Sequence, residues 1–198
     1  MKKSILGLLC MAGLFSVSNC GDSKPTVDSF IAEIQKLENP AALKDLKKAI
    51  RDHKYSSVID DENSKGETPL VTAAGLMDDF VAASIVNALT SAGADPEKFG
   101  TSKDGHGKIT PLMEAALHGN SKVVAKLLYP SSGSVKKADV NKLADGKTAL
   151  YFALLKSPNF DVIYDLLNTG AKVTSEVQLL LPKVNFKQSV EEFKKLAA

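Results

Sequence analysis

The sequence predicts an all-α fold in which pairs of short helices stack side by side as a solenoid. Three short segments align with one another, each is followed by a second apolar segment, and amphipathic stretches flank the set. The aligned segments are GETPLVTAA (66–74), GKITPLMEAA (107–116) and GKTALYFAL (146–154). Units of this kind bury their apolar faces only against one another, so they are expected to stack.

The middle copy predicts two antiparallel helices. Thr110 can cap the free amide groups of a first helix, and Pro111 suits its first position, where a missing N–H costs nothing. Gly119 is expected to end this helix in the left-handed conformation, and Asn120 or Ser121 to cap a second helix. The first helix buries Leu112, Ala115 and Ala116, and the second, which Pro130 ends, buries Val123, Val124, Leu127 and Leu128.

Amphipathic stretches on either side of the repeats predict capping helices, whose charged faces suit the solvated ends of a stack. Two helices are expected before the repeats, the second of them after Pro40, and two more after the repeats. Their apolar faces comprise Val27, Phe30, Ile31, Ile34 and Leu37; Leu43, Leu46, Ala49 and Ile50; Val177, Leu180 and Leu181; and Val190, Phe193 and Leu196.

The aligned segments resemble ankyrin repeats, whose units contain a hairpin finger, Gly-x-Thr-Pro-Leu-His-x-Ala-Ala, a glycine and Gly-Ala-Asp. The matching residues are Thr68-Pro69-Leu70, Ala73-Ala74 and Gly93-Ala94-Asp95; Thr110-Pro111-Leu112, Ala115-Ala116 and Gly119; and, more weakly, Thr148-Ala149-Leu150, Ala153 and Gly170-Ala171. Val71, Met113 and Tyr151 replace the family histidine. The aligned threonines are 42 and 38 residues apart, against about 33 in regular repeats. Other helical-hairpin solenoids, tetratricopeptide or armadillo-like, are the alternative.

The resemblance implies one ankyrin-repeat domain over residues 27–198. It comprises an N-terminal cap (27–58), three repeats (about 59–95, 96–139 and 140–173) and a C-terminal cap (174–198). The loops over residues 96–109 and 129–139 are long for the family. Such insertions either contribute to binding or reflect drift in tolerant loops, and the sequence does not separate the two.

Residues 1–19 have the pattern of a bacterial secretory signal. Lys2 and Lys3 precede an apolar run from Ile5 to Phe15, which is too short to span a membrane as a helix. If this segment is removed, 23 of the 25 basic side chains remain against 23 acidic ones. A neutral domain lacks the positive excess of a nucleic-acid binder, so no nucleic-acid partner is expected.

The end of the signal, SVSNCG, resembles a lipoprotein lipobox, in which a cysteine is lipidated and becomes the first residue after cleavage. The resemblance implies lipidation at Cys20, a tether over residues 20–26, and membrane anchoring in the bacterial cell envelope. Gly21 favours the outer membrane over the inner membrane, because some bacteria read Asp at that position as an inner-membrane signal. The alternative is an ordinary cut before Asn19, which is bulky for the lipobox. The protein would then be soluble, periplasmic or secreted, and would act as an inhibitor or assembly factor for an exported partner.

No motif predicts catalysis, a metal site or a cofactor. The Gly-Lys-Thr of ADGKT (144–148) lacks the earlier glycine of a phosphate-binding loop, because Asn141 occupies that position. His53, His106 and His118 have no second ligand at metal-binding spacing. An enzyme is therefore the minor alternative, with His106 or His118 as its candidate residue.

The ankyrin resemblance implies a protein partner that contacts the finger tips and the exposed residues of the first helices. Position by position, the candidate residues are Lys65, Glu67, His106, Lys108, Leu117, His118, Asp145, Lys147 and Lys156. An exposed Leu117 beside a histidine and several lysines suits a mixed contact patch. The main hypothesis is a monomeric, lipid-anchored, non-catalytic protein that binds another protein at the cell envelope.

Overall fold

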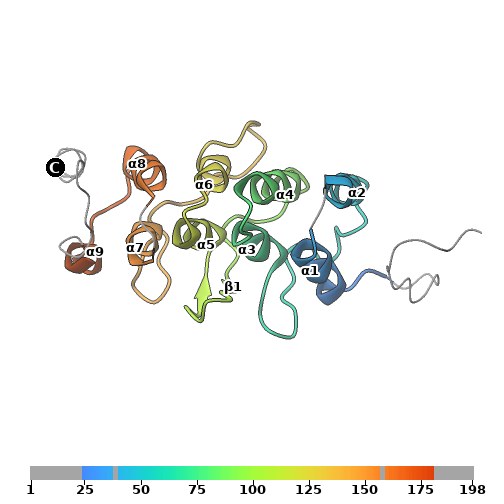
Figure 1. Cartoon of the computed structure of the whole chain (residues 1–198), viewed down its shortest axis with the longest axis horizontal. Helices are drawn as coiled ribbons and strands as arrows, with labels where there is room; N and C mark the ends of the chain where they lie inside the picture. The colour runs from blue at the N-terminus through green and yellow to red at the C-terminus, as the bar shows by residue number, and fades with distance from the viewer. Residues whose placement is uncertain (1–23, 38–39, 157–158, 181–198) are drawn as a thin grey trace, which may run out of the picture.

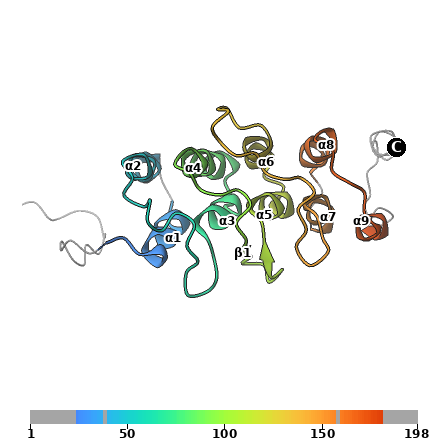
Figure 2. The same ribbon diagram turned by 180° about the vertical axis from the view of Figure 1, so that it is seen from behind.

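The computed structural model describes residues 24–37, 40–156 and 159–180. Its helices form two rows, which Figure 1 and Figure 2 show from opposite sides. The inner row comprises α1 (Val27–Gln35), α3 (Pro69–Ala74), α5 (Pro111–His118), α7 (Ala149–Leu155) and α9 (Ser175–Leu180), and the outer row comprises α2 (Pro40–Arg51), α4 (Asp79–Ser91), α6 (Ser121–Leu128) and α8 (Phe160–Asn168). Successive helices of each row pack side by side. The predicted all-α solenoid of helix pairs is confirmed.

The predicted helix starts of the first two repeats are confirmed. Thr68 and Thr110 each accept a hydrogen bond at Oγ1 from the backbone N–H three residues later, at 3.4 Å. Pro69 and Pro111 follow them at the start of α3 and α5. Thr148 stands at the same place before α7, but its side chain makes no such bond. The weaker third copy therefore begins its helix without this side-chain cap.

The middle helices of the inner row, α3 and α5, are buried on nearly all sides. Every residue of α5 except His118 is buried, because α3, α6, α7 and the second finger surround this helix. Ala73, Ala74, Ala115 and Ala116 are at most 1% exposed. Their small side chains allow neighbouring inner helices to approach closely, as their spacing predicts. The buried apolar residues form a core that runs along the whole described stack.

The fingers project past the inner row, below α3, α5 and α7 in Figure 1. The second finger contains an antiparallel pair of short strands, β1 (Gly100–Thr101) and β2 (Lys108–Ile109). The third finger has a single bridge, between Ala144 and Lys147. These are short hairpins, as the family resemblance implies.

Two contacts tie the second finger to the first repeat. The N–H of Thr101 donates to the carbonyl of Gly66 at 2.8 Å. A side chain at Gly100 would place its Cβ 2.7 Å from Oγ1 of Thr68, so glycine is required for this close approach. The second finger is thereby held against the first finger and the start of α3.

The two ends of the described stack are closed differently. At the N-terminal end the rings of Phe30 and Tyr55 stack at 3.9 Å, and the Tyr55 hydroxyl donates to Oε2 of Glu33 at 2.6 Å. Burial raises the pKa of Tyr55. At the other end α9 buries Val177 against α7. The predicted signal segment, Cys20 and the last predicted helix lie outside the described residues.

Candidate interaction surface

A group of charged side chains joins the second finger to the first helices of two repeats. Asp104, at the finger tip, accepts a hydrogen bond from Nζ of Lys156 at 2.6 Å and lies 3.5 Å from Nε2 of His118. Nδ1 of His118 lies 3.0 Å from the carbonyl oxygen of Glu114 and 3.8 Å from its carboxylate. We call Asp104, Glu114, His118 and Lys156 the finger–helix cluster. It unites two of the predicted contact residues, His118 and Lys156.

The carboxyl group of Glu114 is the buried member of this cluster. Its side chain is 3% exposed, and Oε2 has no hydrogen-bond partner among the described residues. Burial raises the pKa of Glu114, whereas the hydrogen bond from Lys156 lowers the pKa of Asp104. Gly75 makes room for the buried group, because a Cβ there would lie 2.6 Å from Oε1. The cluster thus holds two carboxyl groups with opposite pKa shifts.

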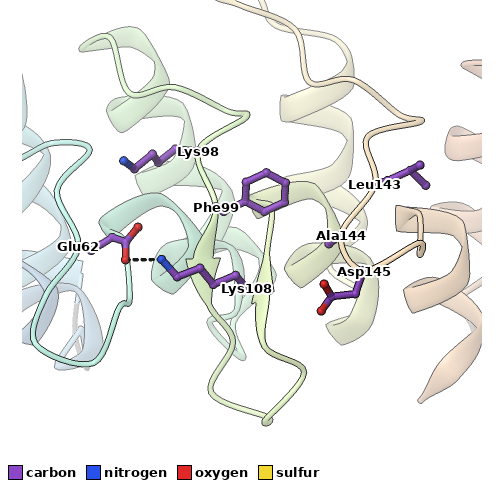
Figure 3. Close-up of a pocket in the computed structure, with 7 residues that line it drawn as sticks. All are labelled: Glu62, Lys98, Phe99, Lys108, Leu143, Ala144 and Asp145. Carbon is purple, nitrogen blue, oxygen red and sulfur yellow. Dashed lines mark hydrogen bonds and ion pairs between the residues drawn. The ribbon is translucent and has the colours of Figure 1, made fainter.

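A cavity of about 490 Å³ lies among the three fingers (Figure 3). We call it the finger pocket, and it is lined by Glu62, Lys98, Phe99, Lys108, Leu143, Ala144 and Asp145. Nζ of Lys108 bonds to Oε2 of Glu62 at 2.7 Å. Nζ of Lys142 lies 5.7 Å from the centre of the Phe99 ring. The pocket therefore combines apolar side chains with charges of both signs, and it unites the predicted residues Lys108 and Asp145.

Two of the predicted contact residues are buried. Leu117 is 0% exposed, so the expectation of an exposed leucine at this position is wrong. It fails because α5 has neighbours on every side. Glu67 is 7% exposed and accepts a hydrogen bond from Nδ2 of Asn63 at 2.8 Å. Asn63 Oδ1 in turn accepts the N–H groups of Lys65 and Glu67, so Glu67 shapes the first finger.

The remaining predicted residues lie on the fingers. Lys65 is exposed at the first finger. The ring of His106 meets the ring of Phe152 edge to face, with centroids 5.9 Å apart. Nζ of Lys147 lies 5.5 Å from the centre of the Tyr151 ring. These side chains extend the charged and aromatic surface around the cluster and the pocket.

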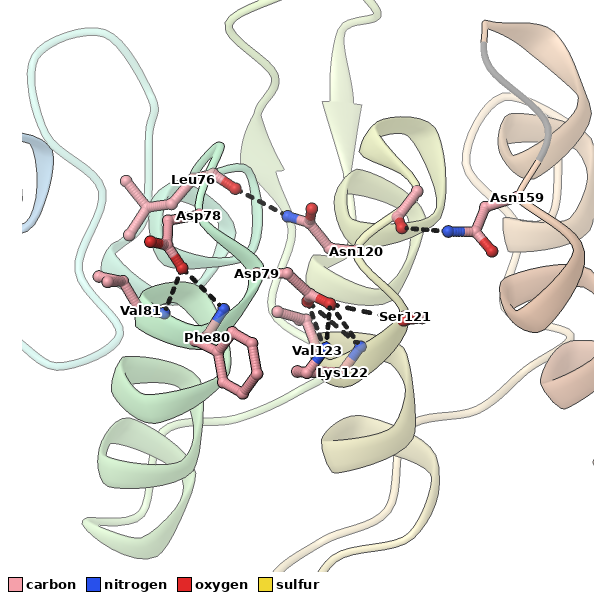
Figure 4. Close-up of polar contacts among 11 residues, drawn as sticks. Leu76, Asp78, Asp79, Phe80, Val81, Asn120, Ser121, Lys122, Val123 and Asn159 are labelled. Carbon is pink, nitrogen blue, oxygen red and sulfur yellow. Dashed lines mark hydrogen bonds and ion pairs between the residues drawn. The ribbon is translucent and has the colours of Figure 1, made fainter.

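The edge at which each first helix turns into its second uses side-chain amides and a carboxylate to hold the stack (Figure 4). We call it the helix-turn edge. Nδ2 of Asn120 donates to the carbonyl oxygens of Ala74 and Leu76 in the preceding repeat, at 2.8 and 2.9 Å. Nδ2 of Asn159 donates in the same way to Gly119, at 2.9 Å. Gly119 has a φ of 69°, the left-handed end that was predicted for α5.

The start of α6 is capped from another repeat. The Asn120 side chain makes no capping bond to its own helix, contrary to expectation, because its amide donates to the preceding repeat. The carboxylate of Asp79 accepts the backbone N–H groups of Lys122 at 3.1 Å and Val123 at 3.4 Å instead. The negative carboxylate also complements the positive end of the helix dipole. No local sequence signal indicates this role of Asp79, because its partners lie more than forty residues further on.

In the ranges that the structure describes, no group of three or more His, Cys, Asp or Glu side chains could hold a metal ion. No helix in these ranges is long and apolar enough to cross a membrane.

This chain belongs to the ankyrin-repeat family. A family model of three ankyrin repeats matches residues 79–177, which is half of the chain. Among solved structures, the fold is similar to the crystal structure of the ankyrin repeat domain of Bcl-3, described as a unique member of the IkappaB protein family. The TM-score is 0.54 at 23% sequence identity, over 77% of this chain and 69% of that one. This likeness shows the fold alone. None of the curated proteins matches the sequence.

Proposed function

We propose that the protein is a non-catalytic binding protein whose fingers and first helices hold a partner protein. Membership in a family of interaction repeats supports this at the level of class. The finger pocket carries the proposal further, because it is a recess with apolar and charged groups side by side. Recognition surfaces between proteins typically combine apolar groups with polar groups at the rim.

The chemistry of the finger pocket indicates the kind of segment it accepts. Leu143 is 55% exposed and Phe99 is half-buried, so both offer apolar area to a partner. Lys98 is exposed and makes no ion pair within the described residues, whereas Lys108 is already paired with Glu62. We therefore expect a partner segment with an apolar side chain beside a carboxylate, with the carboxylate near Lys98.

A paired substitution tests this surface. Leu143→Asp with Lys98→Glu changes an exposed apolar group of the pocket and a cation that is unpaired within the described residues, and leaves the buried core intact. The control is Met77→Asp with Lys126→Glu, which changes the same types of residue away from the pocket. Met77 lies at the helix-turn edge and is 90% exposed, and Lys126 lies on α6. Proteins crosslinked in cells would be captured with each variant and quantified by mass spectrometry. The proposal predicts that one partner is lost with the pocket variant only, and equal capture by all forms contradicts it.

We further propose that the mature chain is acylated at Cys20 and held at the outer membrane. The support comes from the sequence: a short apolar run, the SVSNCG segment and Gly21 after the cysteine. A stable anchor needs more than one acyl chain, and lipoprotein maturation supplies two or three. Cys20→Ala should move the protein out of the membrane fraction and abolish lipid labelling. An unmodified N-terminus in the mature wild-type protein would instead favour the soluble periplasmic or secreted form.

A further inference from the structure

A basic groove lies between α2 and α4 at the N-terminal end of the outer row. It has a volume of about 430 Å³ and is lined by Lys47, Arg51, His53, Asn87, Ala88, Ser91 and Ala92. Three of these side chains are basic types, Asn87 and Ser91 can hydrogen-bond, and no carboxylate lines the groove. Such a recess suits a negatively charged group with several oxygen atoms.

The groove continues into a cationic face of α2. The basic residues of this helix are Lys44, Lys47, Lys48 and Arg51. Their spacing of three, four and seven residues places them on one side of the helix. Leu46 and Ile50, which are at most 4% exposed, lie on the side that faces the core. We call the groove and these four residues the α2 basic surface.

The charges of the α2 basic surface are not neutralised by ion pairs inside the described structure. None of its four cations makes an ion pair there, whereas Lys108, Lys136 and Lys156 each do. Lys48 and Arg51 stand in the last turn, where they complement the helix dipole. That effect does not account for Lys44 and Lys47, which precede the last turn. The segment from residue 40 to residue 54 carries five basic side chains against two acidic ones.

His53 is fixed at the rim of the groove by the end of α2. Its φ is 59°, the left-handed region that normally favours glycine at a helix end. The backbone N–H of His53 donates to Ile50, and that of Lys54 donates to Ala49, both at 3.1 Å. Glycine would hold this turn at a lower conformational cost. The imidazole ring therefore occupies the groove rim although the backbone alone would favour a smaller residue.

We propose that the α2 basic surface binds anionic phospholipid headgroups, so that the N-terminal end of the solenoid lies against the membrane. The location rests on the anchor proposed above, since α1 begins seven residues after Cys20 and seven residues span at most about 25 Å. Each lysine or arginine near an anionic surface strengthens binding by about fivefold. One acyl anchor and a basic surface together hold a protein more firmly than either alone.

The shape of the surface favours a membrane over an acidic protein. The cations spread over about 10 Å of a single helix, the distance that seven residues cover. The groove beside them offers a headgroup-sized recess with two neutral hydrogen-bonding side chains, Asn87 and Ser91. No large apolar side chain borders it, although such side chains usually anchor contacts between proteins. The surface therefore matches a plane of phosphate groups.

Vesicle binding by the unacylated mature chain, Cys20→Ser, tests the proposal apart from the anchor. Vesicles of phosphatidylglycerol and phosphatidylcholine in equal parts would be compared with phosphatidylcholine alone by co-sedimentation. The variant K44E/K47E/K48E/R51E removes the cationic face. The matched control K98E/K103E/K126E/K137E reverses four exposed lysines elsewhere that also make no ion pair within the described residues. Circular dichroism checks that each variant is folded.

The expected result is binding to the anionic vesicles only, weakened by salt and reduced by more than about 100-fold in the α2 variant. The matched control should keep most of the binding. His53→Gly gives an independent reading, since it should raise the midpoint of thermal unfolding while weakening vesicle binding.

Equal binding to neutral vesicles, equal loss in both quadruple variants, or no binding at all would overturn the proposal. The proposal would also be overturned if an acidic protein crosslinked to the wild type in cells and only the α2 variant lost this crosslink. If Cys20→Ala left the protein in the membrane fraction, only the proposed anchor would be refuted.

Discussion

The two edges of the solenoid use their polar residues in opposite ways. At the helix-turn edge, Asn120, Asp79 and Asn159 bond to backbone groups of neighbouring repeats. At the fingers, the carboxylates of Glu62 and Asp104 accept hydrogen bonds from Lys108 and Lys156, and more than half of each lysine side chain is exposed. Backbone partners are fixed by the fold, whereas exposed ion pairs can exchange one partner for another at little cost.

The contacts at the helix-turn edge link repeats that are irregular in sequence and spacing. The histidine that the ankyrin pattern has between neighbouring units is replaced here, and the spacing of the units is uneven. Asn120 and Asp79 connect neighbouring units, because they reach from one repeat to the next. The fingers are then left to vary in length and charge.

Asn120→Ala should cause the largest loss of stability. It removes both hydrogen bonds to Ala74 and Leu76 and leaves their carbonyl oxygens without a partner at a position that is 5% exposed. We expect the free energy of unfolding to fall by about 3 kcal/mol. Urea titration measures this change, with Asn168→Ala on exposed surface as the control. A loss no larger than that of the control would show that the repeats are not joined here.

Glu114→Leu should stabilise the protein at neutral pH. The fold raises the pKa of Glu114 because burial disfavours its charged form, so the native state holds this proton more tightly than the unfolded chain does. The stability of the wild type therefore falls as the pH rises above the range in which an ordinary glutamate ionises. We expect a gain of about 2 kcal/mol at neutral pH that shrinks in acid. Thermal unfolding against pH measures it, and a pH-independent difference would contradict this account.

Asp79→Ala should release the start of α6, although the residue belongs to α4. The carboxylate caps the N–H groups of Lys122 and Val123, and such a cap contributes about 1 kcal/mol. Hydrogen exchange should rise at these two amides. If it rises only at the start of α4, the cap between repeats is not formed in solution.

The pair of Glu62 and Lys108 should contribute least to stability. Their charged atoms are 2.7 Å apart, but the side chains are 32% and 57% exposed. A double-mutant cycle with Glu62→Ala and Lys108→Ala should give a coupling below about 0.5 kcal/mol. A coupling above 1 kcal/mol would place this finger contact among the connections that hold the stack.

Signals that are local in the sequence predicted the helix pairs, but they did not predict the contacts between repeats. Thr110 and Pro111 predict a helix start, because the capping hydroxyl of Thr110 and the N–H group that it accepts are only three residues apart. The structure confirms this start. The burial of Leu117 and Glu114 depends on neighbours from other repeats and from the finger. An eight-residue helix shows too little periodicity to reveal that it is covered on every side. The finger pocket likewise draws its walls from three fingers, and no single motif encodes it.

The proposed function assigns partner binding to the finger edge and the contacts that hold the stack to the helix-turn edge. A photoreactive amino acid placed in living cells at Leu143, or alternatively at Met77, tests it directly. Both residues are exposed, at 55% and 90%, so neither substitution disturbs the core. The account predicts a covalent adduct with one other protein from position 143 and none from position 77. An adduct from position 77 alone would contradict it.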